Sequence, residues 1–285
     1  MKICKIIWST NRLEYLIPTL ETTRRYVDWG DHEVDGIFID DMPTDRDDEL
    51  IETIAKSHGY NNVILHKENK GLPLVWEECY DIIKSSGKEY DYIFHQEDDL
   101  VIGDYIKIND LINFFNENKN IHQINFAYQL NWYPQNHDSK IDESKLNDWG
   151  DYNIISSPDR CGFDTSYSFT RAPSYINMLD KWKAGLLDWV STFSLNEGSV
   201  FSAYANYLGR SFDSYCTFYK SKKNIVEHIG EWSWGQRITE EAVAKCKIII
   251  ESGDASPDTL YQANAYLKMA EDPTAKINSR TWHRI

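Results

Sequence analysis

The chain has 285 residues and a formal net charge of −15, with 26% charged and 14% aromatic residues. This acidic balance disfavours duplex nucleic acid and acidic membrane surfaces as partners, because binding to both depends on clustered Lys and Arg. The length predicts one large domain, or one domain with an appendage, with enough residues to build a proper core.

The five cysteines are odd in number and scattered, and no two of them form a Cys-x-x-Cys pair. This pattern predicts neither a disulfide framework nor a zinc site. The first apolar run is too short for a signal peptide, and no run is long enough to span a bilayer. We therefore expect a cytoplasmic protein without a membrane span.

Three strand–loop–helix units open the chain. The expected strands and the helices that follow them are 2–8 and 13–26, 36–39 and 48–58, and 63–66 and 74–84. A fourth apolar strand, 92–94, runs into Glu97, Asp98 and Asp99. Alternation at this spacing predicts an α/β fold with an open, mostly parallel sheet flanked by helices, in which the loops after the strands meet at one edge.

That edge is expected to collect Ser9 to Arg12, Asp40 and Asp41, Asn69 to Gly71, and Glu97 to Asp99. None of these loops carries a glycine-rich phosphate motif, so Rossmann and Walker-type nucleotide sites are both disfavoured. A nucleotide at this edge would instead be held by carboxylates and a metal ion.

The carboxylates themselves indicate two kinds of contact. Three adjacent acidic side chains repel one another unless a cation neutralises them, and hard oxygen ligands favour Mg²⁺ or Mn²⁺, with a diphosphate as the natural companion. A solvated acidic turn is the alternative. Asp40 or Asp41 can accept hydrogen bonds from a base or a ribose, and a helix-entry cap is the alternative there.

Together these motifs resemble the nucleotide-sugar half of a GT-A glycosyltransferase, of family 2 and of the N-acetylglucosaminyltransferase I family. The resemblance rests on Asn11-Arg12-Leu13, Phe38-Ile39-Asp40-Asp41, Asn69-Lys70-Gly71 and Gln96-Glu97-Asp98-Asp99-Leu100. It covers residues 1–105, which we expect to be the nucleotide-sugar-binding half of a catalytic domain, with 106–236 as its acceptor-binding half.

The resemblance also implies roles for single residues. Asp40 or Asp41 would contact the base and ribose of a uridine nucleotide, with Thr10, Arg12, Lys70 and Gly71 nearby. Glu97 and Asp98 would contact the ribose or sugar, and Asp99 would bind Mn²⁺ or Mg²⁺. Glu97 stands where the GT-A motif often has an aspartate.

In the second half, we expect a helix at 110–116, a strand at 121–127 and a polar, irregular loop over 128–157, where an acceptor would enter. A strand-like stretch, 161–171, corresponds to one that lines the donor sugar in the resembling families. A helix is expected to start at Ser174, after Pro173 at its first turn.

Two acidic residues are candidates for the base that removes the acceptor's proton. Glu197 stands near the position of a Glu-Asp pair in inverting family-2 enzymes, but Gly198 replaces the Asp; a plain carboxylate at a helix N-terminus is the alternative. Asp188, before Trp189, resembles an acidic stretch in the N-acetylglucosaminyltransferase I family.

Two later residues complete the expected site. His228 fits the late histidine that completes the metal site in many GT-A enzymes, although a lone histidine is more often structural. Trp232 is expected in the wall of the sugar or acceptor cleft, with the core as the alternative.

Residues 237–285 read as a helical C-terminal appendage, with helices at 242–252 and 258–271 forming a hairpin suited to a homo-oligomer contact. The resemblance implies a metal-dependent, inverting transfer of a sugar from a UDP-linked donor to a glycan or other hydroxyl acceptor. Two alternatives stay open: a sugar-1-phosphate nucleotidyltransferase and a non-catalytic carbohydrate-binding relative.

Overall fold

The computed structural model describes residues 1–42, 45–70, 72–126, 146–155, 167–183, 215–221 and 223–229, with a few isolated positions between 247 and 267. The chain divides into two compact units, one of residues 1–129 and 140–230 and the other of residues 130–139 and 231–285. The first unit is described below. The expected hairpin within 237–285 lies outside the described ranges.

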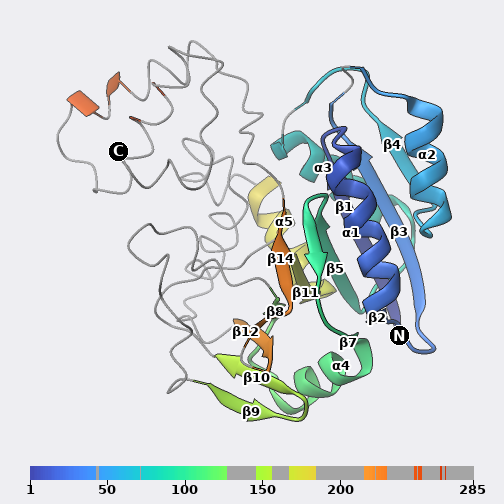
Figure 1. Cartoon of the computed structure of the whole chain (residues 1–285). Coiled ribbons are helices and arrows are strands. Elements are labelled where there is room, and N and C mark those ends of the chain that lie inside the picture. Colours follow the sequence, from blue (N-terminus) through green and yellow to red (C-terminus); the bar gives the residue numbers. More distant parts are fainter. Residues whose placement is uncertain are drawn as a thin grey trace. The chain divides into compact units, whose positions relative to one another are not determined.

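Figure 1 shows the helices and strands. The strands are β1 (Lys2–Ser9), β2 (Val27–Asp28), β3 (Glu33–Asp40), β4 (Asn62–Leu65), β5 (Tyr92–Glu97), β6 (Leu100–Ile102), β7 (Ile106–Lys107), β8 (Gln123–Asn125), β9 (Asn147–Trp149), β10 (Tyr152–Ile155), β11 (Tyr167–Arg171), β12 (Tyr215–Lys220), β13 (Lys223–Asn224) and β14 (Val226–His228). The helices are α1 (Leu13–Tyr26), α2 (Asp48–Ser57), α3 (Leu72–Ser85), α4 (Ile108–Glu117) and α5 (Ala172–Lys183).

The main sheet confirms the predicted α/β class. Its strands follow the order β4-β3-β1-β5-β11-β8-β12-β10-β9, and β13 pairs with β12. From β4 to β5 all pairs are parallel, and antiparallel pairs enter with β11. The carboxyl ends of β3, β1 and β5 therefore meet at one edge, as expected for consecutive β-loop-α units.

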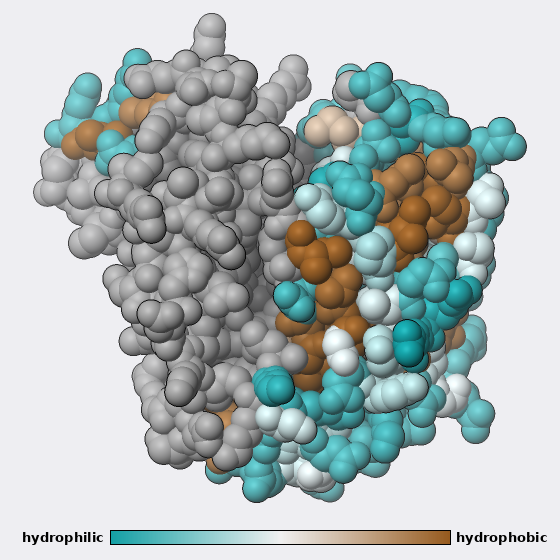
Figure 2. Space-filling view, viewed as in Figure 1, coloured by the Kyte–Doolittle hydropathy of each residue, from teal (hydrophilic) through white to brown (hydrophobic). Residues whose placement is uncertain are grey.

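Helices cover both faces of the sheet, because successive side chains of a buried strand point to opposite faces. Ile7 packs with Leu16 of α1 and Ile51 of α2, whereas Ile6 packs on the opposite face with Cys79 of α3. On the face of the unit that α1 and α2 form, apolar patches are set among polar residues (Figure 2). Among the described helices, none is both long enough and apolar enough to cross a bilayer.

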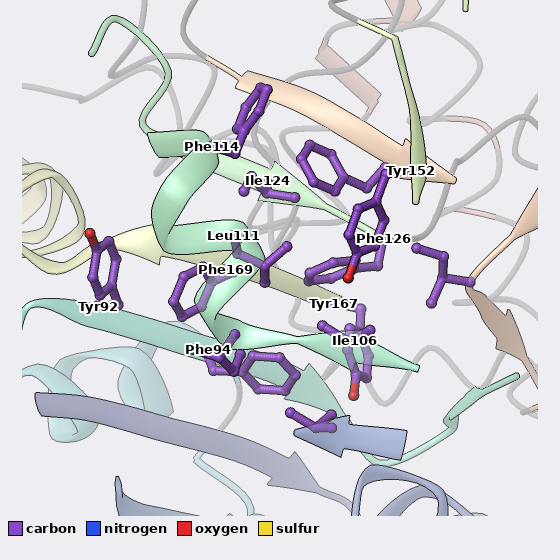
Figure 3. Close-up of a cluster of buried hydrophobic side chains, with 14 of the residues drawn as sticks. Tyr92, Phe94, Ile106, Leu111, Phe114, Ile124, Phe126, Tyr152, Tyr167 and Phe169 are labelled. Atoms are coloured by element: carbon purple, nitrogen blue, oxygen red, sulfur yellow. The ribbon is translucent and has the colours of Figure 1, made fainter. Parts of the chain in front are cut away.

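An aromatic cluster joins the parallel strands to the mixed half of the sheet (Figure 3). Phe94 of β5 meets Tyr167 of β11 edge-on, with 5.3 Å between ring centroids, and Tyr92 stacks on Phe169 at 4.9 Å. Phe115 of α4 stacks on Tyr92, with 5.6 Å between ring centroids. Such aromatic pairs add to the burial energy and fix α4 against β5 and β11.

The prediction of irregular chain throughout 128–157 was wrong for its last part. Trp149 and Tyr152 pair across a two-residue turn as β9 and β10, and Gly150 in that turn has φ 56°, which glycine adopts without strain. Trp149 packs edge-on against Phe114, with 5.2 Å between centroids. Long-range aromatic packing therefore stabilises a hairpin whose own sequence carries a weak strand signal.

Lys5 is an unusual charge in the middle of β1. Its side chain is buried, Nζ lies 4.2 Å from the centroid of the Tyr60 ring, and Nζ donates to the carbonyl of His58 at 2.5 Å. Burial lowers the pKa of Lys5 from 10.5 to about 8.

We predict that Lys5 makes stability depend on pH between about 8 and 10.5. In that window the unfolded chain keeps a proton on Lys5 that the folded chain has released, so the free energy of unfolding rises with pH. At about 1.4 kcal/mol per pKa unit, the pKa shift of Lys5 corresponds to a rise of about 3 kcal/mol in the free energy of unfolding. This figure is an upper limit, because the contacts of Nζ with the Tyr60 ring and the His58 carbonyl favour the charged form. Urea unfolding at pH 7.5 and pH 10 measures it in the wild type and in Lys5→Met, which should lack the rise. Parallel pH profiles would contradict the prediction.

Candidate functional site

Residues 9–12, which comprise the end of β1 and the loop that joins it to α1, lie at the centre of the carboxyl edge of the sheet. In the strand register, Ser9 pairs with Asp40 of β3 and Trp8 pairs with Glu97 of β5. The loops after β3 and β5 therefore flank this loop on its two sides (Figure 1). The sequence predicted this meeting of loops, and the structure confirms it.

Asp40 holds the loop from the β3 side. Its carboxylate is fully buried and accepts the backbone N–H of Asn11 at 2.7 Å, the N–H of Met42 at 3.1 Å and Nη1 of Arg46 at 2.8 Å. The Arg46 side chain is only 1% exposed, so this ion pair is internal. Asn11 has φ 56°, a left-handed conformation that asparagine tolerates better than most residues. Asp40 thus anchors the loop.

Asp98 holds the same loop from the β5 side. Its Oδ2 accepts the backbone N–H of Thr10 at 3.0 Å and Nε of Arg12 at 3.3 Å, and its Oδ1 accepts Nη2 of Arg12. The hydroxyl of Thr19, on α1, donates to the Asp98 carbonyl at 2.9 Å. Burial raises the pKa of Asp98 to about 6; Arg12 opposes that shift and Asp99 adds to it.

Arg12 also reaches the next carboxylate. Its Nη1 lies 3.0 Å from Oδ2 of Asp99, whose side chain is 5% exposed. Burial by itself would lower the pKa of Arg12. The carboxylates of Asp98 and Asp99 outweigh this effect and raise the pKa of Arg12 above its ordinary value. One guanidinium therefore bridges the two aspartates at the end of β5.

Asp41 lies in a second network beside the loop, which Arg46 links to Asp40 by donating from Nη2 to the His66 carbonyl at 2.7 Å. Its Oδ1 lies 2.6 Å from Nδ1 of His66 and accepts the backbone N–H of Lys70 at 2.9 Å. On the other side of the ring, Nε2 of His66 lies 2.6 Å from Glu78 of α3, which also pairs with Nζ of Lys70 at 3.0 Å. Burial raises the pKa of Glu78, but the hydrogen bonds from Lys70 and His66 outweigh it and lower that pKa.

Sequence reasoning missed three residues of these networks: Arg46, His66 and Glu78. The sequence predicts a strand that includes His66, whereas β4 ends at Leu65 and His66 begins the loop at the sheet edge. That position was the available signal for His66. Arg46 and Glu78 are recognisable only from the contacts they make.

The backbone of His228 lies next to the acidic motif. Strand β14 pairs with β6 so that His228 lies opposite Leu100, the residue after Asp99, and the N–H of Ile229 donates to the Asp99 carbonyl at 2.9 Å. The structure thus brings the backbone of the predicted second metal ligand beside the predicted first one, although they are 129 positions apart in the sequence.

The donor atoms at this edge suit a divalent ion in their chemistry. Asp98 and Asp99 offer buried carboxylate oxygens, and Arg12 neutralises only one of their two charges, so the trio keeps a net charge near −1. Within the ranges that the structure describes, no group of three or more His, Cys, Asp or Glu side chains is arranged to hold a metal ion.

Of the predicted site residues, the structure gathers one group at the carboxyl edge: Thr10, Arg12, Asp40, Asp41, Lys70, Glu97, Asp98, Asp99 and the backbone of His228. Four others lie outside the described residues: Gly71, Asp188, Glu197 and Trp232.

Three solved structures that resemble this chain are TarS, mannosyltransferase PcManGT and xyloside xylosyltransferase 1. TarS of S. aureus is 13% identical over 95% of this chain and 44% of its own, with a TM-score of 0.48, so this chain spans less than half of that one. Mannosyltransferase PcManGT of Pyrobaculum calidifontis, in complex with GDP-Man and Mn²⁺, is 13% identical over 94% and 74%, with a TM-score of 0.48. Mouse xyloside xylosyltransferase 1 is 12% identical over 75% and 84%, with a TM-score of 0.39.

No curated protein sequence matches the chain. A family model does: the model described as "Glycosyl transferase family 2" matches residues 5–170. That match spans β1 to β11 almost completely, and it includes the loop 9–12 and both aspartate pairs. Because it covers more than half of the sequence, this protein belongs to glycosyl transferase family 2.

Proposed function

We propose that this family-2 glycosyltransferase moves a sugar from a UDP-linked donor to an acceptor hydroxyl and uses Mn²⁺ or Mg²⁺. The observation that carries the proposal is the carboxyl edge of the sheet, where the pairs Asp40-Asp41 and Asp98-Asp99 flank one loop. In open α/β sheets, ligands bind at this edge. A glycan or another hydroxyl compound is the proposed acceptor.

Within each pair, we assign different tasks to the two aspartates. Asp40 and Asp98 both accept hydrogen bonds from backbone N–H groups of the loop and from arginine side chains. We therefore assign their oxygens to internal contacts that fix the loop. Asp41 is assigned to the base of the donor, because a carboxylate accepts the N–H of a uracil ring well. Asp99, one residue beyond the Asp98 anchor, is assigned to the metal ion.

The metal ion, when bound, would neutralise the charge that develops on the diphosphate leaving group. Arg12 adds a positive charge beside the carboxylates of Asp98 and Asp99. His228 is proposed as the second metal ligand, since its backbone lies opposite Leu100. Trp232 in the cleft wall and Gly71 near the donor stay predictions, as do the cytoplasmic location and a homo-oligomer contact through 237–285.

A panel of nucleotide sugars tests the proposed reaction. We expect the protein to release UDP from at least one UDP-sugar in the presence of Mn²⁺ and an acceptor, and to release little after chelation by EDTA. Pyrophosphate formation from a nucleoside triphosphate and a sugar-1-phosphate would instead show a nucleotidyltransferase. Binding of glycans without turnover of any donor would show a non-catalytic relative.

We predict that Asp41→Ala mainly weakens UDP binding, whereas Asp40→Ala mainly destabilises the fold. Asp41→Ala should lower UDP affinity about tenfold or more, because it removes the proposed acceptor for the base. It should lower the free energy of unfolding by less than Asp40→Ala does, because it removes hydrogen bonds with His66 and Lys70 but no partner of a buried arginine. Asp40→Ala should lower the free energy of unfolding by about 3 kcal/mol or more, because it removes one of the two carboxylates that pair with Arg46 and leaves the N–H groups of Asn11 and Met42 without their acceptor. Titration calorimetry and urea unfolding measure the two quantities. Equal effects of the two substitutions on both would refute this division.

We predict inversion at the anomeric carbon, with Glu197 as the acceptor's base. Glu197→Gln should lower the transfer rate about 10²- to 10⁴-fold, the usual effect of removing a positioned base, while UDP-sugar binding persists. Asp188→Asn is the parallel test of the rival candidate. NMR of the product gives its anomeric configuration. A product that retains the donor's configuration, or near-normal turnover in Glu197→Gln, would remove Glu197 from this role.

A further inference from the structure

The contacts of Arg12 with its two aspartates are unequal. With Asp98, the guanidinium uses two nitrogens, Nε and Nη2, on two carboxylate oxygens. With Asp99, it uses the single nitrogen Nη1, on Oδ2 at 3.0 Å. The two-point contact fixes the plane of the guanidinium, and the contact with Asp99 is the additional one.

Asp98 can hold Arg12 in place without help from Asp99. Besides Arg12, Asp98 accepts the N–H of Thr10, and its side chain is only 3% exposed, so it is fixed in the edge of the sheet. The Arg12 side chain is 20% exposed and therefore lies partly open to solvent above the two carboxylates. The pair between Arg12 and Asp99 can break while Arg12 stays bound to Asp98.

The same oxygen that contacts Arg12 is one that a divalent ion would use. If Asp99 binds the metal of the proposed function, Oδ2 of Asp99 lies within 3.0 Å of a positive charge that a second cation would repel. Metal ions and guanidinium groups both bind carboxylates through these oxygens. The two cations therefore compete for Asp99.

We propose that Arg12 is an internal counter-cation of the acidic motif, which pairs with Asp99 when no metal is bound and which the metal must displace from Asp99. This inference rests on the proposed function, because it takes Asp99 as the metal ligand. It means that the free enzyme binds Mn²⁺ weakly. The negative charges of a donor diphosphate offset the repulsion from Arg12, so metal binding strengthens when the donor arrives.

Mn²⁺ binding to the full chain without nucleotide tests the proposal. Titration calorimetry and the EPR signal of free Mn²⁺ both report this binding and need no catalytic turnover. Arg12→Gln should bind Mn²⁺ about tenfold or more tightly than the wild type, because it removes a competing charged hydrogen bond. Arg24→Gln is the matched control: Arg24 lies on α1, pairs with Glu21 at 2.7 Å and is 61% exposed. It should bind Mn²⁺ as the wild type does.

Two further variants place the effect. Arg12→Gln combined with Asp99→Asn should lose the gained affinity, which shows that the gain arises at Asp99. Arg12→Lys keeps the charge, but a single ammonium cannot contact both carboxylates as the fork does, so its Mn²⁺ affinity should also exceed that of the wild type. Circular dichroism confirms folding, and Arg12→Lys decides the matter if Arg12→Gln does not fold.

The outcomes separate this proposal from the proposed function. If the wild type binds Mn²⁺ together with UDP, but neither Arg12 variant binds Mn²⁺ more tightly than the wild type without UDP, Arg12 is no competitor and the proposal is overturned while the function stands. If neither the wild type nor the variants bind Mn²⁺ with UDP present, the metal-dependent function itself falls, and this proposal falls with it.

Discussion

The site depends on one structural constraint: two buried aspartates hold the loop between β1 and α1 from opposite sides. Asp98 accepts the N–H of Thr10, and Asp40 accepts the N–H of Asn11, the next residue along the chain. Because β1 lies between β3 and β5, the two aspartates approach from neighbouring strands. This arrangement joins the chain segments that follow three neighbouring strands, β3, β1 and β5, into one edge.

The same constraint explains how the edge tolerates so much negative charge. A buried carboxylate is costly unless hydrogen bonds and a positive charge compensate it, and here each anchoring aspartate has both. Arg46 neutralises Asp40 from within the β3 loop, and Arg12 neutralises Asp98 from the α1 side. The residues that follow the two anchors are Asp41, which we assign to the base of the donor, and Asp99, which we assign to the metal ion. The acidic edge can thus be held in shape before any donor binds.

The sequence predicted the order of elements and the edge where the loops meet, because apolar runs alternating with amphipathic helices are a local signal. The resemblance to family 2 is confirmed, and the resemblance to the N-acetylglucosaminyltransferase I family stays a prediction. Local patterns did not reveal which aspartate of each pair is an anchor, since that depends on donors such as Asn11 and Arg46. The pairing of β6 with β14 was missed for a similar reason: it joins residues more than 120 positions apart.

The most direct test of the account is a calorimetric titration of the full chain with UDP, in the presence and in the absence of Mn²⁺. If the carboxyl edge is a donor site of the proposed kind, UDP binds, and Mn²⁺ strengthens that binding because the ion links the diphosphate to the acidic motif. UDP binding that is unchanged by Mn²⁺, or a clear preference for a nucleoside triphosphate over UDP, would contradict the account.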